Sequence, residues 1–158
     1  IGQIDSFTIH IEPYKTRKQK LVIPIQNRDG LNSKIVDHFG RANHFIFITL
    51  EENRVQSHYI KDNPHRTRKV RAGLFAAHEI TKDKVDVLIT RQIGEISFHS
   101  LRGHLVDIYL TKRRIVKDAT DDFVNKKLER LSEPTREIGT EQVEAWARLT
   151  RKGRNKGD

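Results

Sequence analysis

The sequence contains neither cysteine nor methionine. Without Cys the chain has no disulfide framework, no thiol nucleophile and no thiolate ligand, so any metal must bind through imidazole, carboxylate or backbone groups. No apolar run approaches the ~20 residues needed to cross a bilayer, and no charged-then-apolar leader opens the chain. Because the first residue is Ile1 and Met is absent, we expect the sequence to be a piece of a longer protein.

Acidic residues are fewer than basic residues in this sequence. The chain has 30 Lys and Arg residues against 21 Asp and Glu residues, which gives a formal net charge of +9. Such a balance favours anionic partners, for example nucleic acid, an acidic lipid face or an anionic cofactor. A length of 158 residues is sufficient for one domain with an ordinary core.

Hydropathy patterns predict a mixed sheet covered by helices, which is an α/β fold. The continuous apolar runs are typical of strands buried on both faces. Strands are expected over residues 6–12, 21–25, 45–50, 54–60, 85–90 and 105–110, and helices over 70–82, 93–103, 117–131 and 141–149. The composition divides the chain into a first strand (1–14), a basic linker (15–20), the main α/β domain (21–131), and a short helix with a basic tail (132–158).

The segment 34–42 reads Lys-Ile-Val-Asp-His-Phe-Gly-Arg-Ala, and it is followed by Asn63-Pro64-His65 and by Ile93-Gly94 after a buried strand. In this order and spacing, over about residues 20–131, the chain resembles the dinitrogenase iron-molybdenum cofactor biosynthesis family. The resemblance implies a ribonuclease-H-like three-layer α/β/α fold with a five-stranded mixed sheet. It also implies a site for a metal-sulfur cluster or its precursor.

The resemblance places His38 on the ligand-facing loop, with Phe39 packed beneath it, Gly40 permitting a turn that a Cβ would obstruct, and Arg41 supplying charge. The alternative is that His38 only caps or hydrogen-bonds its own loop. The full set of cofactor-binding candidates is His38, Phe39, Gly40, Arg41, His65, Arg91, Ile93 and Gly94.

Two positions depart from the family pattern. Basic residues follow His65 where the family has a Gly- and His-rich stretch, and Arg91 precedes Ile93-Gly94 where the family has small residues. At that turn a strand meets a helix N-terminus, so free backbone N–H groups could bind an anion. The alternative is that these arginines form a solvated rim.

The opening segment, residues 7–13, resembles the last strand of the cytosolic domain of cation diffusion facilitator transporters. On a strand, His10 and Glu12 face the same side, so an imidazole and a carboxylate could meet one divalent cation. The alternative is an ordinary exposed pair. His10, Glu12 and His38 are therefore the candidate metal ligands.

These resemblances predict the cytosolic, ligand- or metal-binding regulatory domain of a cation-efflux transporter, at the cytoplasmic face of a membrane as part of an integral membrane protein. Its expected partners are a divalent cation or metal-sulfur cluster, the rest of the transporter and a second copy of the chain. The alternative is a free-standing metal-sulfur cofactor carrier or assembly accessory protein.

The sequence favours two other classes of function less, namely nucleic-acid binding and catalysis. Nucleic-acid binding would suit the basic clusters, but aromatic residues are not interleaved with them. Catalysis would need carboxylates on the central strand, a nucleophile elbow or a phosphate-binding loop, and residues 21–25 carry no carboxylate. We therefore expect a binding protein and not an enzyme.

Overall fold

The computed structural model describes residues 17–135, and these form one six-stranded sheet with three helices. The strand order is β3-β2-β1-β4-β5-β6. Strands β1, β4 and β5 run parallel to one another, whereas β2, β3 and β6 pair antiparallel with their neighbours. The elements are β1 (Lys18–Ile25), η2 (Gly30–Asn32), η3 (Phe39–Arg41), β2 (His44–Glu51), β3 (Arg54–Asp62), α2 (Ala72–Thr81), β4 (Val87–Thr90), α3 (Glu95–Gly103), β5 (Asp107–Leu110), α4 (Val116–Val124) and β6 (Glu129–Arg130).

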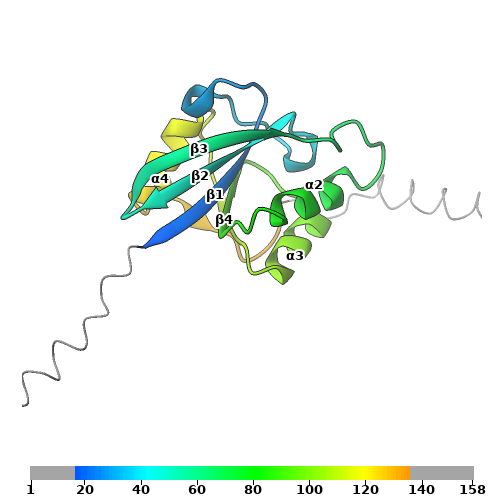
Figure 1. The fold of residues 1–158 in the computed structure, drawn as a ribbon. Coiled ribbons are helices and arrows are strands. Elements are labelled where there is room, and N and C mark those ends of the chain that lie inside the picture. Colours follow the sequence, from blue (N-terminus) through cyan, green and yellow to red (C-terminus); the bar gives the residue numbers. More distant parts are fainter. Residues whose placement is uncertain (1–16, 136–158) are drawn as a thin grey trace, which may run out of the picture.

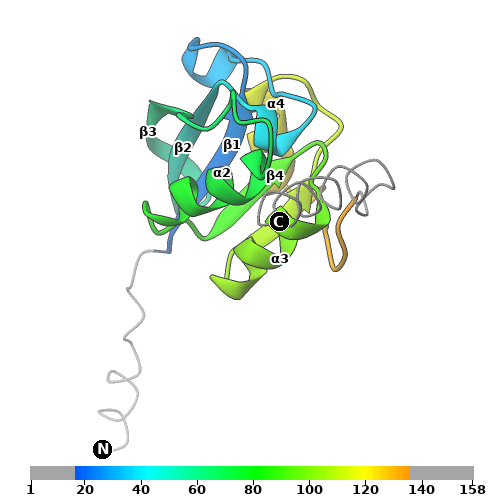
Figure 2. The same ribbon diagram turned by 90° about the vertical axis from the view of Figure 1, so that its right-hand side faces the viewer.

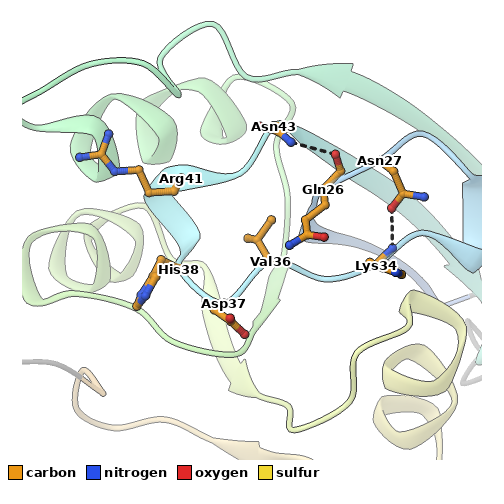
Figure 3. A pocket seen from close by; sticks show the side chains of 8 residues that line it. All are labelled: Gln26, Asn27, Lys34, Val36, Asp37, His38, Arg41 and Asn43. Atoms are coloured by element: carbon orange, nitrogen blue, oxygen red, sulfur yellow. Dashed lines mark hydrogen bonds between the residues drawn. The ribbon is translucent and has the colours of Figure 1, made fainter.

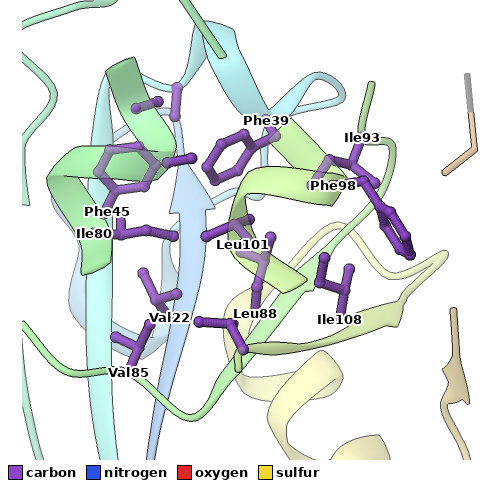
Figure 4. Close-up of a cluster of buried hydrophobic side chains, with 14 of the residues drawn as sticks. Val22, Phe39, Phe45, Ile80, Val85, Leu88, Ile93, Phe98, Leu101 and Ile108 are labelled. Carbon is purple, nitrogen blue, oxygen red and sulfur yellow. The ribbon is translucent and has the colours of Figure 1, made fainter. Parts of the chain in front are cut away.

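The helices cover both faces of the sheet: α2 and α3 lie on one face and α4 on the other (Figures 1 and 2). Successive side chains of a strand point to opposite faces, so neighbours in the sequence enter different cores. Val22 packs in the cluster under α2 and α3 (Figure 4), whereas Leu21 and Ile23 pack in the cluster under α4. The predicted mixed α/β fold is confirmed.

The β2–β3 hairpin turns through two residues, Glu52 and Asn53, which both have positive φ angles of 53° and 62°. This backbone matches the twist of the two strands, which is why such turns dominate short hairpins. The hairpin predicted over 45–60 is therefore present, and it places the end of β3 beside the start of β2.

The predicted helix over 117–131 is wrong in its second half, because α4 ends at Val124 and Lys126 has a positive φ of 58°. Leu128 nevertheless packs against the cluster under α4, and Leu131 packs against the opposite cluster. The apolar spacing continues because Leu128 and Leu131 flank β6 (Glu129–Arg130), where the chain returns to the sheet. This sixth strand makes the expected count of five wrong, and the ribonuclease-H-like label stays a prediction.

Two strand boundaries also differ from expectation, and two predicted elements lie outside the described residues. β1 begins at Lys18, inside the expected linker, because it pairs with β2 from Lys18 opposite Glu51 onward. β5 begins at Asp107 and not at Leu105, which is 86% exposed with a φ of 61°. The strand expected over 6–12 and the helix expected over 141–149 lie outside the described residues.

Candidate functional site

An open depression of about 600 Å³ lies at the edge of the sheet where the parallel strands β1 and β4 end. All of its lining comes from the segment between β1 and β2. Ligands of open α/β sheets bind outside the carboxyl ends of the strands, which makes this edge the expected position for a site. The lining residues are Gln26, Asn27, Lys34, Val36, Asp37, His38, Arg41 and Asn43 (Figure 3).

Hydrogen bonds within this segment hold its wall in one shape. The Gln26 N–H donates to the Lys34 carbonyl at 2.8 Å, and the Lys34 N–H donates to Asn27 Oδ1 at 2.8 Å. Asn43 Nδ2 donates to the Gln26 carbonyl at 2.9 Å (Figure 3). The wall is therefore formed before any ligand arrives, which reduces the entropy cost of binding.

His38 lies on the exposed rim of the depression, directly before η3. The next residue, Phe39, is only 1% exposed, and its ring centroid lies 5.8 Å from that of Phe45. The Phe39 N–H also donates to the Gln92 carbonyl at 3.4 Å, which joins this loop to the loop after β4. The core thus anchors the residue next to the exposed imidazole.

Gly40 packs directly against the start of α2. A Cβ built on Gly40 would lie 2.9 Å from both Cα and N of Gly73, and a Cβ on Gly73 would lie 2.3 Å from Ser97 Oγ in α3. Neither glycine has a positive φ, so the requirement is for space and not for an unusual backbone conformation. This close stacking sets how near the His38 loop comes to α2 and α3.

Arg41 lines the depression, and its guanidinium is directed toward the loop after β3. Its Nη1 donates to the Arg68 carbonyl at 2.7 Å and to the Arg66 carbonyl at 3.3 Å. His65 lies in that loop, where it accepts from Arg68 Nε at 3.2 Å and packs 5.2 Å from the ring of Phe75. His65 is not among the residues that line the depression.

Arg91, at the end of β4, is also absent from the lining, and its side chain is only 19% exposed. Its Nε donates to Asp37 Oδ1 at 3.0 Å. Its Nη1 donates to the carbonyls of Lys112 and Arg113 at 2.6 and 3.1 Å. Arg91 therefore connects the depression to the loop after β5, and it does not form a solvated rim.

The Ile93 N–H, in the turn before α3, already has a partner within the chain. The Ile93 N–H donates to Thr135 Oγ1 at 2.8 Å, and the Ile93 carbonyl accepts from both Oγ1 and N of Thr135. Ile93 itself is buried. Gly94 is the N-cap of α3, and the turn is not part of the depression.

A second carboxylate stands at the same edge of the sheet, at the end of β3. Asp62 Oδ1 lies 2.6 Å from Arg28 Nη1 and 2.7 Å from His44 Nδ1. The hydrogen bond with His44, together with the charge of Arg28, lowers the pKa of Asp62. Its negative charge is therefore offset by the guanidinium of Arg28 and by the hydrogen bond with His44.

The candidate metal ligands do not form a cluster in the described residues. His10 and Glu12 lie outside them. Within residues 17–135, no three His, Cys, Asp or Glu side chains come together as a group that could hold a metal ion. A bare divalent cation would thus have few protein ligands around His38.

Sequence reasoning identified His38 and Arg41 in the depression, but it missed most of the lining. The polar residues that it missed are Gln26, Asn27, Lys34, Asp37 and Asn43. One available signal was position, because Gln26 and Asn27 directly follow the buried strand β1, whose carboxyl end is where ligands bind in such sheets. The others come together only through the folding of the loop.

The family model described as dinitrogenase iron-molybdenum cofactor matches residues 19–126. An uncharacterized protein of Methanocaldococcus jannaschii is 23% identical over 116 residues, which covers 73% of this chain and 94% of that protein. The apo form of the orange protein from Desulfovibrio gigas has a similar fold, with a TM-score of 0.69 and 21% identity over 77% of this chain and 99% of its own. A Thermotoga protein gives a TM-score of 0.63 and 24% identity, with 75% and 97% covered.

These comparisons contradict the predicted transporter tail and the predicted location in an integral membrane protein. They match the cofactor family and not cation efflux, and the match spans nearly the whole of each relative, so no transporter region accompanies the domain there. Among the described residues, no helix is long and apolar enough to cross a membrane. The alternative prediction fits better: the chain belongs to the dinitrogenase iron-molybdenum cofactor family.

Proposed function

We propose that this domain binds an anionic metal-sulfur cofactor, or a molybdenum-containing precursor of one, in the depression beside His38. The domain holds this cargo without transforming it, as a carrier or an assembly accessory protein. The observation that carries the proposal is the lining itself, in which Lys34, His38 and Arg41 are among the eight residues around an open space of about 600 Å³.

The donor chemistry fits a cargo that brings its own sulfide. The chain has no Cys to supply thiolate ligands. Guanidinium, ammonium and amide groups instead donate hydrogen bonds to the outer atoms of an anion, and charge-assisted bonds of this kind are the stronger ones. An imidazole is also a suitable ligand for a transition metal at the surface of a cluster. His38 would supply that contact, and Lys34 and Arg41 the charge.

Family membership supports the same class of cargo, because the matched family is described by the iron-molybdenum cofactor of dinitrogenase. The fold neighbour from Desulfovibrio gigas was solved in an apo form. The depression is open, and an open site suits a cargo that must be received and passed on. A homodimer stays a prediction.

The test is a titration of the whole chain with tetrathiomolybdate. Calorimetry and the visible absorption of the anion are the two readouts of binding. We expect a Kd in the micromolar range, about −8 kcal/mol, and at least a tenfold loss of affinity in His38→Ala. His99→Ala is the matched control, because His99 is exposed on α3 and does not line the depression.

Two results would contradict the proposal. One is the absence of any heat or spectral change with tetrathiomolybdate in the wild-type chain. The other is an equal loss of affinity in the His38 and His99 variants, which would show that the anion binds by charge alone over the surface. The far-ultraviolet circular dichroism of each variant serves to establish that the fold is intact.

A further inference from the structure

Asp37 is an anomaly in a depression that we propose to bind an anion. It is the one carboxylate among the eight lining residues, and it is adjacent in sequence to His38. Its side chain is 54% exposed, so it faces the space that the cargo would occupy. An uncompensated negative charge at this position would repel an anionic cargo, and it would favour a cation instead.

Arg91 reaches Asp37 from a different strand. The Nε of Arg91 donates to Asp37 Oδ1 at 3.0 Å, while its Nη1 is held by the carbonyls of Lys112 and Arg113 at 2.6 and 3.1 Å. The Arg91 side chain is only 19% exposed, whereas that of Asp37 is 54% exposed, so solvent screens this ion pair only on the side of the carboxylate. The guanidinium is thus fixed on its far side by two carbonyls and presents its Nε to the carboxylate.

The backbone around the pair is also connected across strands. The Ile35 N–H donates to the Arg114 carbonyl at 2.8 Å, and Lys34 forms a β-bridge with Ile115. The loop after β5 therefore supports both Arg91 and the wall of the depression.

We propose that Arg91 is the positioning residue that makes the depression selective for anions, by neutralising Asp37 and fixing the loop that carries His38. This inference rests on the proposed function. Arg91 acts through Asp37 and does not contact the cargo, because it does not line the depression. With Asp37 neutralised by Arg91, Lys34 and Arg41 give the lining a net positive charge.

The test is a double-mutant cycle on the whole chain, with tetrathiomolybdate as the probe. The variants are Arg91→Gln, Asp37→Asn and the double variant, and the readouts are Kd and the midpoint of thermal unfolding. We expect Arg91→Gln to weaken binding about tenfold, the effect of one partly screened charge in the lining. Asp37→Asn should bind as tightly as wild type or tighter, and the double variant should stay within about threefold of Asp37→Asn.

Two further variants separate charge from stability. Arg91→Lys keeps the positive charge but lacks the planar fork, so it should lower the unfolding midpoint while it retains affinity within about threefold. Arg102→Gln is the matched control, because Arg102 makes the same kind of contacts with Asp107 Oδ1 at 2.6 Å and with the Val106 carbonyl at 3.4 Å, away from the depression. It should cost stability and leave affinity unchanged.

The outcomes distinguish this inference from the proposed function. If the wild-type chain does not bind tetrathiomolybdate, both fail. If it binds but Arg91→Gln is harmless, or costs the same factor with and without Asp37, the proposed function survives and the inference is wrong. Strong coupling in Kd between the two positions, together with retained affinity in Arg91→Lys, supports the neutralising role.

Discussion

At the scale of single residues, the site depends on one glycine contact and one exposed imidazole. His38 is exposed, whereas Phe39, the next residue, is buried in the core. Gly40 packs against the backbone of Gly73. The position of the imidazole is therefore set by groups that do not line the depression.

We predict that Gly40→Ala destabilises the protein by about 1–3 kcal/mol, the cost of forcing an extra carbon into a packed contact. The new Cβ would lie 2.9 Å from the Gly73 backbone, which cannot move aside as a flexible side chain can. Urea unfolding followed by circular dichroism measures the change in the free energy of unfolding.

Gly103→Ala is the control for this substitution, because a Cβ at Gly103 meets nothing within 4 Å. In the last turn of α3, alanine should be neutral or slightly stabilising. If Gly40→Ala is as harmless as Gly103→Ala, the close approach of η3 and α2 does not hold the loop.

At the scale of elements, the edge strand β3 is fastened to the turn after α2 by one carboxylate. Asp83 Oδ2 accepts from the Tyr59 hydroxyl at 2.6 Å, and its Oδ1 accepts from Lys61 Nζ at 2.8 Å. Burial works to raise the pKa of Asp83, but the hydrogen bonds from Lys61 and Tyr59 outweigh it and the pKa is lowered. Burial and the same carboxylate raise the pKa of Tyr59.

Because the folded-state pKa of Asp83 is lowered, its contribution to stability is present above its unfolded value of 3.8 and is lost as the pH falls through the lower folded value. We predict that Asp83→Asn costs about 1–2 kcal/mol at pH 7. The difference from wild type should shrink below about pH 4.

Thermal unfolding of both proteins between pH 3 and pH 7 measures this convergence. Asp121→Asn is the control, because Asp121 is an exposed carboxylate of α4. If the difference in unfolding midpoint between wild type and Asp83→Asn is constant across this range, the ionised form of Asp83 is not what stabilises the packing of β3.

At the scale of the whole molecule, the sheet divides the interior into two cores that share the same strands. In β4, Leu88 belongs to the cluster under α2 and α3, whereas Ile89 belongs to the cluster under α4. Both are fully buried. The two cores therefore cannot melt independently of the central strands.

We predict that Leu88→Ala and Ile89→Ala each destabilise the protein by about 2–5 kcal/mol. Both variants should still unfold in one transition, so that circular dichroism and differential scanning calorimetry give the same midpoint. Ile96→Ala is the control, because Ile96 is 51% exposed. Two separate transitions, or a variant of either core residue that behaves like the control, would contradict a shared interior.

The sequence alone determined the fold class and the order of most elements, because these depend on local periodicity. Continuous apolar runs such as residues 21–25 are typical of a strand covered on both faces. The segment from His38 to Arg41 was predicted to form the ligand-facing loop, and two of its residues, His38 and Arg41, line the depression. These features follow from residues close together in the chain.

Only the tertiary structure decided which polar groups face the depression and which are already engaged. Arg91 and Ile93 were expected to meet a ligand, but their donors reach Asp37 and Thr135, which lie 54 and 42 residues away in the sequence. Likewise, the apolar residues after α4 read as helix because the pattern cannot show that the chain turns back to the sheet. Hydrogen bonds and packing between distant segments leave no periodic signal, which is why they required the folded chain.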